Sequence, residues 1–147
     1  SNAVGPPSFS DSNCWDLLVN NIVKQIISHK KIIIKSNKLI TRDFFPISSL
    51  TELVSMYVEE NINLQNNIYN FSSGKNRSIE DVCKIVVELA KEVINKSVEV
   101  DYLNNNDSDQ EYFSIDNSEI LKTFQHFKFN LEDEMESLIF KSNSWFN

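Results

Sequence analysis

The sequence contains few of the residues that interrupt helices and strands, form disulfides or bind metals. Among its 147 residues are only 2 glycines, 3 prolines and 2 cysteines, so neither long flexible linkers nor a disulfide framework is expected. Cys14 and Cys83 have no histidine or cysteine neighbours at metal-ligand spacing, and we predict no metal site. Cys83 lies in the apolar run 82–87, where a small core residue is commoner than a reactive thiol.

Positive charge is also scarce. The chain has 14 basic and 21 acidic residues, a net charge of −7, and its only arginines are Arg42 and Arg77. This balance argues against nucleic acid as a partner, because such binding replaces phosphate counterions with protein cations. It leaves open a small phosphorylated ligand, which one well-placed arginine can hold. No apolar run reaches the roughly 18 residues of a membrane span, and without a signal peptide or disulfides we expect a cytoplasmic protein.

The usual catalytic motifs are missing as well. No glycine-rich phosphate loop is present, and no tyrosine is followed by lysine four positions later. His29 and His126 are the only histidines, and neither lies near a plausible nucleophile, so we interpret both as surface or structural residues. The sequence therefore predicts no catalytic residue.

What is present is one globular domain with helical and extended segments in mixed order. Ser1-Asn2-Ala3 is typical of an expression-tag remnant, which would leave residues 4–147 as the domain. Hydrophobic periodicity predicts five helices, over about 15–28, 48–58, 78–93, 117–124 and from 130 onward. Helix caps are expected at Ser49 with Glu52, at Ser78 with Asp81, and at Asn130. Extended segments are expected at 32–34, 39–47, 68–71, 98–102 and 111–115. The expected fold class is a small α/β unit with short strands and about five helices.

Several segments resemble the extended short-chain dehydrogenase/reductase family. Residues 42–49, Arg-Asp-Phe-Phe-Pro-Ile-Ser-Ser, are similar to its R-D-[FY]-x-x-V-x-D segment, and Val4-Gly5-Pro6 resembles its V-x-G-P turn. Residues 68–74 are similar to its Y-N-[IL]-G-[ST]-G segment, and residues 78–81 to the helix start that follows. These resemblances keep the family's order from Val4 to about Lys141.

The resemblance implies a C-terminal, substrate-binding domain of an NAD-dependent nucleotide-sugar epimerase or dehydratase, similar to UDP-glucose 4-epimerase. In that family a Rossmann domain before the V-x-G-P turn binds NAD and carries the catalytic Tyr and Lys. We therefore expect the Rossmann domain, NAD and catalysis to belong to the parent protein and not to this chain. The implied partners are a nucleotide-sugar and the chain's own N-terminal Rossmann domain, and a chain separated from that domain is expected to self-associate.

The resemblance also assigns substrate-binding residues. Arg42 matches the arginine that contacts the substrate diphosphate, although an ion pair with Asp43 or a C-terminal carboxylate is the structural alternative. Ile32, Ile34 and Lys35 match the strand that borders the nucleotide base, and plain core packing is the alternative for Ile34.

The remaining matched positions are expected to be structural. We interpret Gly5, Pro6, Asn70 and Gly74 as turn residues, Asp43 as a local hydrogen-bonding residue and Ser49 as a helix cap. All six residues stand at positions of the family's motifs.

Departures from the family pattern leave other functions open. Ser36-Asn37-Lys38 stands where the family has a glycine-containing turn, and no arginine follows Arg77. One alternative is a degenerate, non-enzymatic module that binds a sugar nucleotide. Another is a bare interaction domain that docks through its amphipathic helices, although such apolar stripes are more often core faces.

Overall fold

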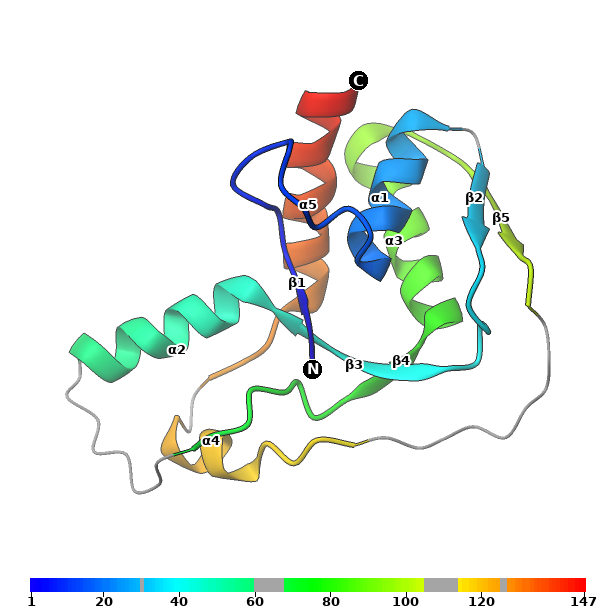
Figure 1. The fold of residues 1–147 in the computed structure, drawn as a ribbon. Helices are drawn as coiled ribbons and strands as arrows, with labels where there is room; N and C mark the ends of the chain where they lie inside the picture. Colours follow the sequence, from blue (N-terminus) through cyan, green and yellow to red (C-terminus); the bar gives the residue numbers. More distant parts are fainter. Residues whose placement is uncertain (30, 60–67, 105–113, 125–126) are drawn as a thin grey trace.

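The structure, a computed structural model, describes residues 1–29, 31–59, 68–104, 114–124 and 127–147 (Figure 1). Within these ranges the helices are α1 Leu18–Ser28, α2 Ile47–Glu59, α3 Ile79–Ile94, α4 Ser118–Thr123 and α5 Leu131–Phe146. The strands are β1 Asn2–Val4, β2 Lys31–Ile34, β3 Thr41–Pro46, β4 Asn76–Ser78 and β5 Glu99–Tyr102. The predicted α/β class, with short strands and about five helices, is confirmed.

The described strands form two small sheets instead of a doubly wound one. In the first sheet β3 is central, parallel to β1 and antiparallel to β4. In the second sheet β2 and β5 run parallel. Figure 1 shows β3 and β4 below the helices α1, α3 and α5, β1 running upward beside the lower part of α5, and the second sheet flanking the helices.

The main core lies between these three helices, each of which packs against the other two. Val82, Cys83, Val86 and Ala90 recur at helical spacing on α3, and all four are fully buried. Phe44 of β3 enters the same core from below. The buried face of each helix thus corresponds to the apolar stripe that the sequence predicts.

A second, smaller core lies on the opposite side of β3. It contains Phe45, Leu53 of α2, Ile120 of α4, Phe124 and Phe127. Because side chains alternate along a strand, the adjacent residues Phe44 and Phe45 enter different cores. Helix α2 projects from the body of the molecule next to this second core (Figure 1).

Two of the three predicted helix caps are confirmed. The backbone N–H of Asp81 donates to the Ser78 hydroxyl at 3.0 Å, and that of Asp133 donates to the Asn130 side chain at 3.3 Å. The cap at Ser49 is wrong, because α2 begins at Ile47 and Ser49 lies buried inside its first turn.

Three extended segments differ from expectation. Strands β1 and β4 were not predicted, and 68–71 is not a strand in the structure. Residues 1–3, interpreted from sequence as a tag remnant, are ordered in the fold: Asn2 and Ala3 pair with Phe44 and Phe45 in β1. Their origin stays a prediction. His126 and most of the predicted segment 111–115 lie outside the described residues.

Candidate functional site

An open groove of about 760 Å³ lies between α1 and β2. Helix α1 contributes Leu18, Asn21 and Gln25, which share one face because they are three and four residues apart. The second wall is β2 and the residues directly after it. The full lining is Asp16, Leu18, Asn21, Gln25, His29, Lys31, Ile33, Ile34, Lys35 and Ser36.

A smaller hollow of about 280 Å³ lies between β1 and the start of α1. Leu18 lines both this hollow and the groove, so the two are neighbours on either side of one side chain. The rest of its lining is Ser1, Asn2, Ala3, Val4, Leu17, Val19, Asn20 and Phe44. Both hollows border α1, and together they make up the candidate site.

The base-bordering residues predicted from the family resemblance occupy different positions in this site. Ile34 and Lys35 line the groove, with Ile34 only 3% exposed and Lys35 at the surface. Ile32 is fully buried in the main core and does not contribute to the lining. A ligand in the groove could therefore reach Lys35 directly, whereas Ile34, like Ile32, packs in the main core, as the core-packing alternative for Ile34 predicts.

Arg42 is exposed on β3, the strand that pairs with β1. Its guanidinium donates one hydrogen bond, to the Thr41 carbonyl at 2.9 Å, and has no carboxylate partner among the residues that the structure describes. The alternative of an ion pair with Asp43 is therefore not seen. Arg42 is absent from the linings of both hollows, so these hollows and the arginine are separate features of the surface.

Asp43 is buried, with 1% of its surface exposed, and anchors a distant turn. Its carboxylate accepts hydrogen bonds from the Ser72 hydroxyl at 3.0 Å, the Ser73 hydroxyl at 2.6 Å and the Ser73 N–H at 3.2 Å. The sequence suggested a local role, but these partners are about 30 residues away. Asp43 thus holds the turn at 72–74 against the strand that carries Arg42.

The same turn requires its glycine. Gly74 has φ = +68°, and a Cβ there would lie 2.8 Å from the amide nitrogen of Asn117. Asn117 in turn donates to the Ser72 carbonyl at 2.9 Å. Asn70 donates to the Asp116 carbonyl at 3.1 Å, and so connects this segment to the start of α4 instead of to nearby backbone.

The turn after β1 is equally crowded. A Cβ on Gly5 would collide with Ile47 and lie 2.6 Å from the Glu134 carboxylate. Glu134, buried on α5, accepts hydrogen bonds from the backbone N–H of Ser48 at 3.2 Å and from its hydroxyl. This carboxylate supplies the helix cap that the sequence assigned to Ser49. Pro6 follows Gly5 outside any strand or helix.

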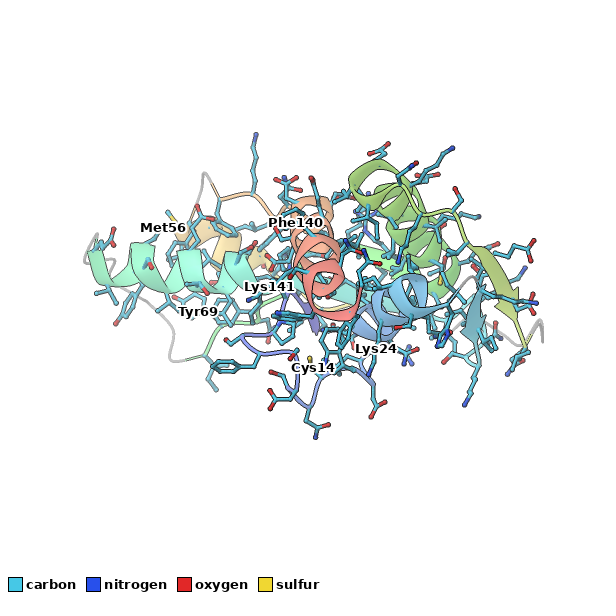
Figure 2. The ribbon with its side chains drawn as sticks, turned by 90° about the horizontal axis from the view of Figure 1, so that it is seen from above. Cys14, Lys24, Met56, Tyr69, Phe140 and Lys141 are labelled. Atoms are coloured by element: carbon cyan, nitrogen blue, oxygen red, sulfur yellow. The ribbon has the colours of Figure 1, made fainter. Side chains whose placement is uncertain are left out.

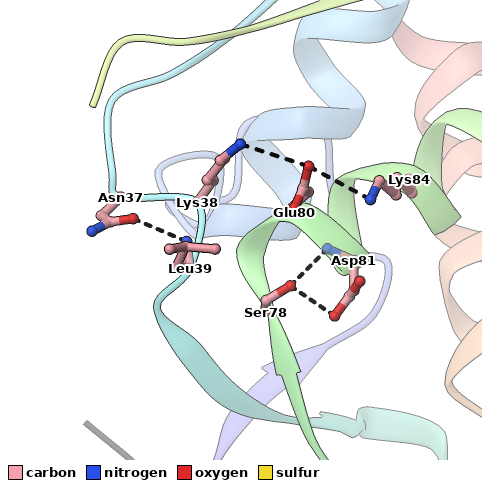
Figure 3. Close-up of polar contacts among 7 residues, drawn as sticks. All are labelled: Asn37, Lys38, Leu39, Ser78, Glu80, Asp81 and Lys84. Carbon is pink, nitrogen blue, oxygen red and sulfur yellow. Dashed lines mark hydrogen bonds and ion pairs between the residues drawn. The ribbon is translucent and has the colours of Figure 1, made fainter. Parts of the chain in front are cut away.

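Before β3, where the family has a glycine-containing turn, this chain forms a turn without glycine. Asn37 is buried, and its side-chain oxygen accepts the Leu39 N–H at 3.0 Å, which closes a turn without glycine (Figure 3). The Lys38 carbonyl accepts the Glu80 N–H at 3.0 Å, so the turn is fixed to the start of α3. Glu80 also forms ion pairs with Lys38 and Lys84 (Figure 3).

The described residues contain no metal-binding group of His, Cys, Asp or Glu side chains. Cys83 is fully buried, and burial raises the pKa of its thiol to about 11, which suits a core residue better than a nucleophile. No described helix is both long and apolar enough to cross a lipid bilayer.

The sequence matches no protein-family model and no curated protein, but the fold matches solved structures. One is RMD from Pseudomonas aeruginosa complexed with NADPH (12% identity, TM-score 0.72), over 98% of this chain and 46% of that one. Another is UDP-glucose 4-epimerase from Thermotoga maritima with UDP-glucose (14%, TM-score 0.70), over 98% and 44%. A third is UDP-N-acetylglucosamine 4-epimerase from Methanobrevibacter ruminantium (19%, TM-score 0.68), over 94% and 42%.

These matches show the fold: that of nucleotide-sugar epimerases and dehydratases of the extended short-chain dehydrogenase/reductase type. The chain spans less than half the length of each of these structures. The predicted recognition of this fold is therefore confirmed.

Residues of the groove other than Ile34 and Lys35 were missed from sequence. Leu18 could only be identified as part of the apolar stripe of α1, and Asn21 and Gln25 belong to no motif. Glu134 was missed because it acts on a helix start 86 residues away. No local sequence signal could have indicated that contact.

Proposed function

We propose that this chain is the substrate-binding domain of an NAD-dependent nucleotide-sugar epimerase or dehydratase, and that it carries no catalytic residue of its own. The observation that carries the proposal is the groove between α1 and β2. Ile34 and Lys35, the residues that the family resemblance places beside the nucleotide base, line that groove. The fold match to enzymes whose structures hold UDP-sugars supports the same substrate class.

In this proposal Arg42 binds the substrate diphosphate. A guanidinium combines a permanent charge with a fork of N–H donors that fits phosphate oxygens. Arg42 suits the task because it is exposed and, among the described residues, has no carboxylate to neutralise it. Arg42 pairs in register with Arg77 of β4 and lies outside the linings of both hollows, so the diphosphate would extend beyond the hollows to reach it.

NAD would belong to the N-terminal Rossmann domain of the parent protein. As a hydride acceptor the cofactor supplies the redox chemistry, and the contribution of this chain would be to hold and orient the sugar nucleotide. We place the protein in the cytoplasm, where such sugar nucleotides are made and used, with neither nucleic acid nor membrane as a partner.

An apolar surface on α2 and its neighbours is the proposed contact with the Rossmann domain. Val54 is 51% exposed and Tyr57 43% exposed, and both line a hollow of about 270 Å³. Its lining is almost entirely apolar: Leu53, Val54, Tyr57, Tyr69, Phe71, Ile120 and Phe124. Surfaces of this kind usually mark interaction sites, and the neighbours are more than twice as long as this chain.

The proposal is tested by binding of UDP-glucose to the protein expressed from its full gene, measured by calorimetry. Replacing Arg42 with glutamine should weaken binding about 10- to 100-fold, because hydrogen bonds to charged groups contribute about 1.5–3 kcal/mol each. The matched control Lys84→Gln removes an exposed cation from α3 and should leave affinity unchanged. Equal affinities of the Arg42→Gln variant and the unaltered protein for UDP-glucose would show that Arg42 does not bind the substrate.

A degenerate, non-enzymatic sugar-nucleotide module is the second candidate. It is favoured by the absence of any arginine after Arg77 and by the loss of the glycine turn. Incubation of the full protein with UDP-glucose and NAD separates the two: the enzyme should give NADH absorbance or an epimerised or dehydrated product. Tight binding without either would support the module.

A further inference from the structure

The side chain of Gln25 pairs with β2 as if it were a neighbouring strand. The Ile33 N–H donates to the Gln25 side-chain oxygen at 2.8 Å, and the Gln25 amide donates back to the Ile33 carbonyl at 3.4 Å. Two reciprocal bonds to one residue are the pattern by which antiparallel strands pair. A single side chain of α1 thus satisfies both polar groups of Ile33 at the groove wall.

This pairing occurs at the free edge of β2. The opposite edge faces β5, where the Ile34 carbonyl accepts the Leu103 N–H at 2.9 Å. Because backbone groups of successive strand residues point to alternate sides, Ile33 faces away from β5. Gln25 covers Ile33, and Lys35, the first residue after β2, also lines the groove.

The orientation of the Gln25 amide is fixed by a second contact. Its nitrogen donates to the Asn21 side-chain oxygen at 2.6 Å, and the Asn21 nitrogen donates to the Trp15 carbonyl at 3.2 Å. Gln25 and Asn21 are four residues apart, so they are neighbours on α1. With its oxygen accepting from an N–H and its nitrogen donating to two oxygens, the Gln25 carboxamide has only one consistent orientation.

We propose that Gln25 is a positioning residue of the ligand-binding groove, an inference that rests on the proposed function. It holds the outer edge of β2 in place and takes up both backbone hydrogen-bonding groups of Ile33. A planar ligand with adjacent hydrogen-bond donors and acceptors, such as the base of a nucleoside diphosphate, then meets that edge at Lys35. Gln25 acts on the ligand through the strand and takes no part in binding its phosphates.

The experiment compares Gln25→Met, which keeps the side-chain length but forms neither hydrogen bond, with the exposed control Lys91→Met on α3. The probes are UDP and inorganic pyrophosphate, titrated into the full-length protein by calorimetry. Gln25→Met should weaken UDP binding about five- to tenfold, the effect of losing one or two hydrogen bonds, and leave pyrophosphate affinity unchanged. Hydrogen exchange at the Ile33 amide should become faster in the same variant.

Each outcome decides between the hypotheses. If the unaltered protein binds UDP and Gln25→Met binds it equally well, the positioning role is overturned while the proposed function stands. If the unaltered protein binds no UDP, both fail together. Equal losses for UDP and pyrophosphate would mean that Gln25 only supports the fold. Dimerisation of the variant with unchanged UDP affinity would show that Gln25 merely shields a strand edge, which also overturns the proposal.

Discussion

Arg42 and Asp43 are adjacent on β3 but have opposite environments. The guanidinium of Arg42 is exposed, whereas the carboxylate of Asp43 is buried and accepts three hydrogen bonds. An arginine–aspartate pair in sequence suggests an ion pair, yet strand alternation separates the two side chains. The arginine remains available for a ligand because the aspartate is committed to the turn at 72–74.

Replacing Asp43 with asparagine should therefore destabilise the protein without acting on Arg42 directly. The change removes the charge that strengthens bonds from Ser72 and Ser73, and we expect a loss of about 2 kcal/mol in the free energy of unfolding. Urea denaturation measures it. The control Asp11→Asn, at an exposed position, should stay within about 0.5 kcal/mol of the unaltered protein. A similar small effect for Asp43→Asn would contradict the anchoring role.

Among the secondary-structure elements, the ones with their own periodicity were predictable. Helices α1, α3 and α5 carry apolar stripes, and Ser78 and Asn130 mark two helix starts by local chemistry. The strands β1 and β4 are three residues long and pair with residues far along the chain, so nothing local indicates them. Residues 68–71 have strand-like composition, but composition alone does not supply a pairing partner.

The start of α2 depends on another helix, which gives a prediction at this scale. Replacing Glu134 with alanine removes the acceptor for the Ser48 N–H and should cost about 1 kcal/mol, as loss of a helix cap does. Hydrogen exchange at the first turn of α2 should become faster. Glu136→Ala, exposed on the same helix, is the control. Unchanged exchange in α2 would mean that Glu134 does not cap it.

At the scale of the whole molecule, the apolar α2 surface is where we expect association to occur. Figure 2 shows Met56 and Tyr69 on the side of α2, away from Lys24 and Cys14 near α1. We expect the 147-residue chain to self-associate through this surface at high concentration, measured by light scattering. Val54→Lys should shift it toward monomer, because the substitution places a charge in an apolar contact.

Phe140→Lys is the matched control, since Phe140 is also exposed, at 69%, but lies on α5 (Figure 2). If Val54→Lys and Phe140→Lys reduced association equally, the chain would associate through its exposed apolar residues in general and not specifically through the α2 surface. A chain that stays monomeric throughout the concentration range would contradict the prediction. If the proposed Rossmann domain also uses the α2 surface, its binding should compete with self-association.

The candidate site was only partly accessible from the sequence. The resemblance pointed to Ile34 and Lys35, which line the groove, and to Arg42, which is exposed but lies outside both hollows. It also pointed to Ile32, whose side chain is buried in the core. A motif gives the order of residues along the chain, whereas the groove also depends on which face of α1 turns toward β2. That relationship is fixed by packing between distant segments.

The two aromatic neighbours on β3 also restrict how this strand can move. Phe44 fills one core and Phe45 fills the other, so sliding β3 by a single residue would pull both rings out of their compartments together. The two buried rings thereby fix the register of the strand. Arg42 lies two residues before Phe44, so the fixed register of β3 also fixes the position of its backbone. A ligand that binds Arg42 therefore has to approach this one place on the surface.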